Sequence, residues 1–169
     1  QWFLDPLNKK GPDFERNKKR ILDKIKYVDA SFLTTSPDAL NFLSNENSFF
    51  IPNPSDKSFE ILNNFNKSCN VDVFFALSHG VHRGVLKSGK IDDRINFLKD
   101  LVHKTPDVKF DLYGIDKVQP IWADHYFKTI SNAKMGLNLS RGEAIKYYSS
   151  DRITQIVGNG LVCLIDEKT

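Results

Sequence analysis

Strand-like and helix-like runs alternate along almost the whole chain, and no other feature constrains the fold as strongly. Runs rich in β-branched and aromatic residues, such as residues 71–77, are followed by stretches with apolar residues at helical spacing, such as residues 91–102. Strands are predicted at 2–4, 31–35, 48–51, 71–77, 108–113, 135–139 and 161–165, and helices at 14–28, from 36, and at 91–102, 122–130 and 151–157. This alternation predicts an α/β fold, with a Rossmann-like parallel sheet and flanking helices.

Composition fits a globular α/β protein, because 40% of the 169 residues are hydrophobic and 27% are charged. No apolar run reaches the roughly 18 residues that span a bilayer, so we predict no transmembrane helix. The net charge of +3 is too small to favour nucleic acid as a partner, although it is compatible with an anionic ligand. Two cysteines, Cys69 and Cys163, do not make a disulfide scaffold and favour a reducing compartment.

The loops that follow strands are the expected ligand sites, because ligands of parallel sheets bind at the carboxyl ends of the strands. Residues 78–84, Ser-His-Gly-Val-His-Arg-Gly, directly follow a predicted buried strand. Gly80 would let a ligand approach the backbone, and Arg83 offers a cationic fork for phosphate. The alternative is a surface loop whose glycines only serve turns. His79 and His82 alone do not predict a zinc site.

A second candidate is the segment that leads from the strand at 135–139 into the helix at 151–157. It contains Ser-Arg-Gly-Glu at 140–143, and Ser149, Ser150 or Asp151 can cap the helix. Free amides and the positive end of the helix dipole then form an anion site. A cation such as Arg152 is unfavourable in the first turn, because the dipole is positive there. Its presence therefore favours a bound anion as its partner. The alternative is a capped helix with a solvated arginine.

Three further positions have weaker signals. Gln155 lies one turn after Arg152, so the two side chains share a helix face. The alternative is an ordinary exposed helix residue. Tyr113 and Gly114 end a predicted strand, where an aromatic ring could stack on a base or simply close the strand. Asp5 follows the first strand as a candidate base or substrate ligand, or as part of an Asp-Pro turn. The chain contains no Walker, GxGxxG or GxSxG motif.

Four segments carry a resemblance to a family. Residues 28–40 and 49–54, with Ile51-Pro52-Asn53-Pro54, resemble the end of the N-terminal domain of a GT-B glycosyltransferase of the group 1 type. Residues 72–77 resemble the first strand of its donor-binding domain. Residues 151–160, Asp-Arg-Ile-Thr-Gln-Ile-Val-Gly-Asn-Gly, resemble its helix with an arginine and a glycine stop.

The resemblance implies a division of the chain and a set of ligands. Residues 1–55 would be the end of the acceptor domain plus a linker, and residues 56–169 a donor-binding domain truncated at its C-terminus, so the chain is expected to be a fragment. A nucleotide-diphosphate sugar would bind mainly to the second domain, and a glycan or lipid-linked acceptor mainly to the first. The enzyme would act in polysaccharide or glycoconjugate synthesis in the cytoplasm. Its basic helix at 14–28 would provide a peripheral contact with the inner membrane.

The resemblance also assigns roles to residues. Gly80, His82 and Arg83 would face the diphosphate or the sugar, and Ser149, Ser150 and Arg152 would hold the diphosphate. Tyr113 and Gly114 would lie near the base, and Gln155 stands where the family usually has a ribose-binding Glu. We take Asp5 and His82 as the candidate catalytic residues and expect neither a metal nor a cofactor. The absence of an acidic pair and the glutamine at 155 favour an alternative function, a non-catalytic α/β module that binds a nucleotide or phospho-ligand. A further alternative is a flavodoxin-like interaction domain that binds no nucleotide-sugar.

Overall fold

The computed structural model describes residues 1–169 except residues 12, 45, 82–84 and 86–90. Its described part divides into two compact units. The first contains residues 1–55, 140–154 and 166–169, and the second contains residues 56–139 and 155–165. These units are groups of segments that pack together, and they do not test domain boundaries. The division into domains at 1–55 and 56–169 stays a prediction.

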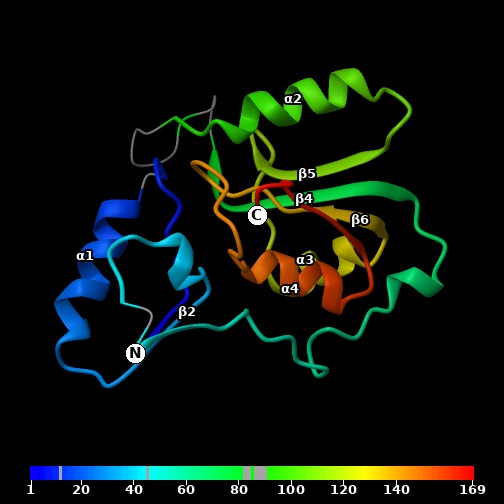
Figure 1. The fold of residues 1–169 in the computed structure, drawn as a ribbon. Coiled ribbons are helices and arrows are strands. Elements are labelled where there is room, and N and C mark those ends of the chain that lie inside the picture. The colour runs from blue at the N-terminus through cyan, green and yellow to red at the C-terminus, as the bar shows by residue number, and fades with distance from the viewer. Residues whose placement is uncertain (12, 45, 82–84, 86–90) are drawn as a thin grey trace. The chain divides into compact units, whose positions relative to one another are not determined.

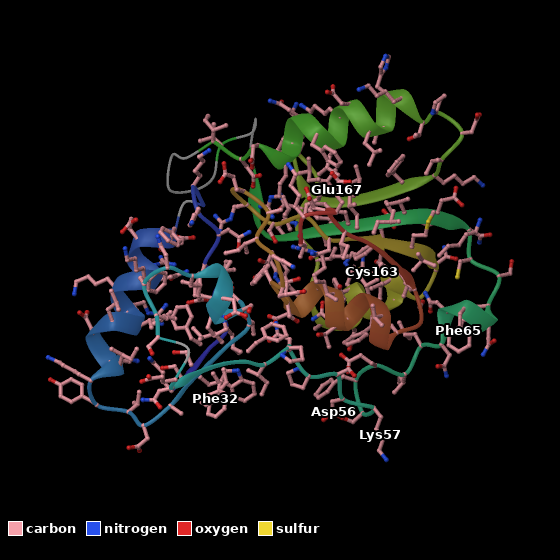
Figure 2. The ribbon with its side chains drawn as sticks, viewed as in Figure 1. Phe32, Asp56, Lys57, Phe65, Cys163 and Glu167 are labelled. Carbon is pink, nitrogen blue, oxygen red and sulfur yellow. The ribbon has the colours of Figure 1, made fainter. Side chains whose placement is uncertain are left out.

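The first unit is built on a parallel sheet with the strand order β1-β2-β3. Its strands are β1 (Trp2–Phe3), β2 (Ser31–Leu33) and β3 (Ser48–Phe50). The helix α1 (Phe14–Ile25) connects the first two strands, and the short 3₁₀ helix η1 (Pro37–Ala39) lies between the next two. Ile21 of α1 packs with Phe3 and Leu33 in a buried core. Phe32 is 41% exposed and stacks on Phe49 (Figure 2).

Residues 140–154 complete this first unit although they are distant in sequence. Ile145 and Tyr148 are buried in the same core as Phe3 and Leu33. Tyr148 forms an antiparallel bridge with Thr35, just beyond β2. The first unit therefore depends on a segment more than a hundred residues downstream of β2.

The second unit contains a four-stranded parallel sheet with the order β5-β4-β6-β7. The strands are β4 (Val71–Val81), β5 (Phe110–Ile115), β6 (Ala133–Leu137) and β7 (Val162–Leu164). They are joined by α2 (Arg94–Lys104), α3 (Ala123–Ile130) and α4 (Asp151–Gly158), and the 3₁₀ helix η2 (Asn64–Asn66) precedes β4. The predicted α/β, Rossmann-like class is thereby confirmed.

Helices cover both faces of this sheet (Figure 1). On one face, Ile95 and Leu98 of α2 pack against Phe75 of β4. On the other face, Ile130 of α3 and Ile156 of α4 pack around Phe74. Side chains of β4 are buried on both faces, as its continuous apolar run predicts.

The strand order places a topological switch point between β4 and β6. The chain goes from β4 to β5 on one side and then crosses to β6 on the other side of β4. In open α/β sheets, ligands bind beyond the carboxyl ends of the two strands at such a point. The loops after β4 and β6 are therefore the ligand loops that this topology selects.

Some predicted element boundaries are wrong. The strand predicted at 108–113 runs from Phe110 to Ile115, so Gly114 does not end it. Gly114 has a φ of +74°, and a Cβ there would lie 2.2 Å from the carbonyl oxygen of Leu77. The helix expected after Ser36 is only the single turn of η1, and Ser36 makes no side-chain cap hydrogen bond.

The two cysteines are free thiols. Cys69 is buried, and Cys163 of β7 is partly buried against the core around Phe74 (Figure 2). Among the described residues, no helix combines the length and apolarity needed to cross a membrane.

Candidate functional site

The start of α4 is capped by one of the three residues predicted for that role. The Ser150 hydroxyl accepts the backbone N–H of Ile153 over 3.4 Å, and the Ser150 carbonyl accepts the same N–H over 3.1 Å. Ser150 thus occupies the N-cap position and satisfies an amide of the first turn. Arg152 follows in that turn and is half-buried. The predicted roles of Ser150 and Arg152 in holding a diphosphate stay predictions.

Ser149 is held by the linker of the first unit. Its hydroxyl accepts the backbone N–H of Asn53 over 3.1 Å, and its carbonyl accepts the Asn53 side-chain amide over 3.0 Å. Its own N–H donates to the Thr34 carbonyl over 2.7 Å. Ser149 therefore has a clear structural function as an anchor, which the sequence did not suggest.

Gln155 in the second unit is oriented by a tyrosine. Its Oε1 accepts a hydrogen bond from the Tyr126 hydroxyl of α3 over 2.9 Å. The amide nitrogen still offers two donors, and the oxygen keeps a second lone pair. The ribose role of Gln155 stays a prediction.

Tyr113 packs inside the second unit. Its ring lies 6.2 Å from the ring of Phe74 and 6.1 Å from that of His125, measured between centroids. Burial, and then the Asp111 carboxylate that accepts from its hydroxyl, raise the pKa of Tyr113. Its assignment to the base, together with that of Gly114, stays a prediction. The ring sits within β5 rather than at the end of the strand.

The candidate catalytic residue Asp5 forms an ion pair. Its Oδ2 lies 2.7 Å from Nη1 of Arg20 on α1, and both side chains are about half-exposed. Asp5 lies just beyond β1, at the carboxyl edge of the first sheet. This position is compatible with contact to a ligand, and the arginine keeps the carboxylate pointing back toward α1.

The loop after β4 is described only in part. Gly80 belongs to β4, which runs four residues beyond the predicted end. His82 and Arg83 lie outside the described residues, so their predicted roles stay predictions. Among the residues that the structure describes, no three His, Cys, Asp or Glu side chains gather as a metal site.

The loop that follows β1 packs against residues 140–143 within the first unit. Gly142 has a φ of +82°, and a Cβ there would come within 2.5 Å of the Gly11 nitrogen. Arg141 pairs with Asp13 over 3.1 Å, and Glu143 pairs with Lys10. The Lys10 ammonium lowers the pKa of the Glu143 carboxyl. A small hollow, with a cavity volume of about 10 Å³, lies here and is lined by Pro6, Asn8, Gly11, Asp13, Phe14 and Arg141.

One polar pair near the switch point was missed by sequence reasoning. Asp92 and Arg94 precede and begin α2, and their side chains form a buried ion pair with a 2.6 Å contact. Arg94 Nη1 also donates to the carbonyl of Leu139, just after β6. The available signal was the Asp-Asp-Arg sequence at the start of a predicted helix, which reads equally well as a solvated helix terminus.

Comparison with known proteins gives one match to a family model, over part of the chain. Residues 94–169, from α2 to the last residue of the chain, match the model of a family described as glycosyl transferase-like. This match supports the resemblance to a GT-B glycosyltransferase of group 1 type, and it includes the segment 151–160. Residues 28–54 and 72–77 lie outside the matched region. Neither the curated proteins nor the solved structures gave a significant match.

Proposed function

We propose that this chain is part of a glycosyltransferase that takes a sugar from a nucleotide-diphosphate donor and passes it to a glycan or lipid-linked acceptor. The coarser statement, a glycosyltransferase-like protein, rests on the family match over residues 94–169. The donor and acceptor classes come from the family resemblance. The alternative is a non-catalytic module that binds a nucleotide or a phospho-ligand.

The observation that carries the proposal is the start of α4. Here a helix capped by Ser150 begins, and Arg152 is in its first turn. Such a terminus binds anions through its amides and its dipole, and the guanidinium adds a full positive charge. The terminus lies inside the residues that match the glycosyl transferase-like family.

The chemistry that these groups would assist is departure of the nucleotide diphosphate. The bond between the anomeric carbon and the diphosphate oxygen breaks, and that oxygen leaves with the electron pair. A bond forms between the anomeric carbon and an acceptor hydroxyl oxygen, whose proton passes to a base. Amides and Arg152 would stabilise the charge that develops on the diphosphate. In this proposal no metal is needed, and Asp5 and His82 are the candidate bases.

Binding of the diphosphate is the direct test. Titration calorimetry with UDP, GDP, ADP and dTDP on the unmodified chain, and on the variant Arg152→Ala, should show one diphosphate whose affinity falls at least tenfold in the variant. Arg16→Ala, which removes an exposed arginine of α1, is the matched control and should leave the affinity unchanged. Equal affinity in the Arg152 variant would remove the anion site from the proposal.

Turnover separates the enzyme from the binding module. Incubation with nucleotide-sugars, in the presence of acceptor saccharides, should release the nucleotide diphosphate if the chain catalyses transfer. A chain that binds a diphosphate tightly but releases none from any donor would favour the non-catalytic alternative.

A further inference from the structure

A buried ion pair at the start of α2 holds an arginine that also contacts the loop after β6. Asp92 accepts Nε of Arg94 over 2.9 Å and Nη2 over 2.6 Å, so the carboxylate holds the guanidinium with both oxygens. Its Oδ1 also accepts the Arg94 backbone N–H over 3.1 Å. The Asp92 side chain is fully buried, and that of Arg94 is only 11% exposed. The planar fork is therefore fixed in one orientation.

The third nitrogen of Arg94 reaches the end of a different strand. Nη1 donates to the carbonyl oxygen of Leu139 over 3.4 Å. Leu139 lies two residues beyond β6 and is the last residue of the second unit before the chain continues to Ser140. Asp92, by contrast, ends the loop that follows β4. Arg94 thus connects the end of the loop after β4 with the loop after β6, and the strand order selects both loops for ligand binding.

This arginine is not itself suited to bind an anion. Its Nε and Nη2 are directed at Asp92, whose charge neutralises it, and Nη1 is directed at a carbonyl. Stability alone is also a weak reason for such a pair. Burying two charges costs about as much as their attraction returns, and apolar replacements of buried pairs are often neutral. A cation in the first turn of α2 further opposes the helix dipole.

We propose that Arg94, held by Asp92, is a positioning residue that fixes the point at which the loop after β6 leaves the sheet. By holding the Leu139 carbonyl, it restrains the backbone of the second unit two residues after β6. The affinity of the protein for a nucleotide diphosphate then depends on Arg94, although the arginine does not contact the ligand. This inference rests on the proposed function and adds a residue to it.

The variants that test it remove the fork in two ways. Arg94→Lys keeps the charge beside Asp92 but loses the rigid fork that spans Asp92 and Leu139. The double variant Asp92→Ser with Arg94→Met removes both charges together, so no buried charge is left without a partner. Lys99→Ala is the control on the same helix, because Lys99 is exposed and pairs with Asp116 over 3.3 Å.

Three measurements distinguish positioning from mere stability. We expect thermal unfolding of the double variant to begin well above the assay temperature. We expect its affinity for the diphosphate that the unmodified chain binds to fall about tenfold, with Arg94→Lys intermediate. Backbone amides of residues 138–142 should exchange hydrogen about tenfold faster in the double variant, because the local restraint is gone. The Lys99 variant should match the unmodified chain in all three measurements.

The outcomes separate this inference from the proposed function. An unmodified chain that binds none of the four diphosphates overturns the proposed function, and the affinity part of this inference with it. An unmodified chain that binds one of them, with both variants binding equally well and exchanging equally slowly, overturns the positioning role alone. A loss of affinity that merely follows a loss of folded protein also contradicts positioning.

Discussion

Asn53 and Ser149 are joined by two hydrogen bonds, although 96 residues separate them. The Asn53 backbone N–H donates to the Ser149 hydroxyl, and the Asn53 side-chain amide donates to the Ser149 carbonyl. The contact links the linker after β3 to the segment that leads into α4, inside the first unit.

Asn53→Ala should lower the free energy of unfolding by about 1 kcal/mol, because a part-buried carbonyl loses its side-chain donor. Urea unfolding followed by circular dichroism measures the change. Asn47→Ala is the control, since Asn47 is exposed on the same unit, and it should have no measurable effect. Equal midpoints for the two variants would show that the Asn53 amide contributes nothing.

Gly136→Ala should destabilise the second unit by about 1–3 kcal/mol through overpacking. A Cβ at this position of β6 would lie 2.4 Å from Cγ1 of Ile156 on α4. Ile156→Val removes one of the side-chain carbons in contact with it and should partly rescue the double variant. Denaturant unfolding of the four proteins forms a double-mutant cycle. Strictly additive effects would contradict the close approach of α4 to β6.

Two variants of Ser150 should distinguish its role in helix capping from a role in anion binding. Ser150→Ala should cost about 1 kcal/mol of stability by removing the cap. Ser150→Asp keeps an N-cap acceptor and should retain stability, but its negative charge should weaken binding of a nucleotide diphosphate. Thermal unfolding and calorimetry on both variants check this. Tighter diphosphate binding by the aspartate variant would place the anion elsewhere.

The chain should lose stability in strong alkali because of Tyr148. Burial raises the pKa of this tyrosine from 10.0 to about 12. The folded state therefore holds the phenolic proton more tightly than the unfolded state does. The resulting stabilisation is complete below pH 10 and is lost as the pH rises through 12.

Absorbance of the tyrosinate near 295 nm and circular dichroism, recorded together between about pH 9 and 13, measure this dependence. The variant Tyr148→Phe has no phenol at this position, so the loss of stability that ionisation of Tyr148 causes in alkali should disappear. Tyr147→Phe, which changes an exposed neighbour, should leave it in place. A Tyr148 that ionises near pH 10 without loss of structure would contradict its burial.

The sequence predicted those parts of the fold that depend on local patterns. The continuous apolar run of β4 indicates a strand buried on both faces, and Phe74 and Phe75 are indeed buried on opposite sides. The periodicity of α1 and the serines before α4 likewise predicted their elements, because helical spacing and capping act over a few residues.

Features that depend on distant contacts were not predictable from one sequence. The end of β5 was misplaced because Gly114 serves close packing against Leu77 rather than a turn. The link from Arg94 to Leu139 spans 45 residues, and no local pattern marks Leu139 as its acceptor. The anchoring of Ser149 by Asn53 has the same origin. Local rules identified the helix start, and only the structure supplied its neighbours.

The first unit is built from segments that are far apart in the sequence, and this affects the order of folding during synthesis. Residues 1–55 emerge from the ribosome early, but Ile145 and Tyr148 of their core are made about a hundred residues later. Until then Phe3 and Leu33 lack part of their apolar cover, and the incomplete core is a candidate for chaperone binding. The long loop to be closed also slows folding. The second unit, whose β4, β5 and β6 are contiguous in sequence, can begin to form its sheet first.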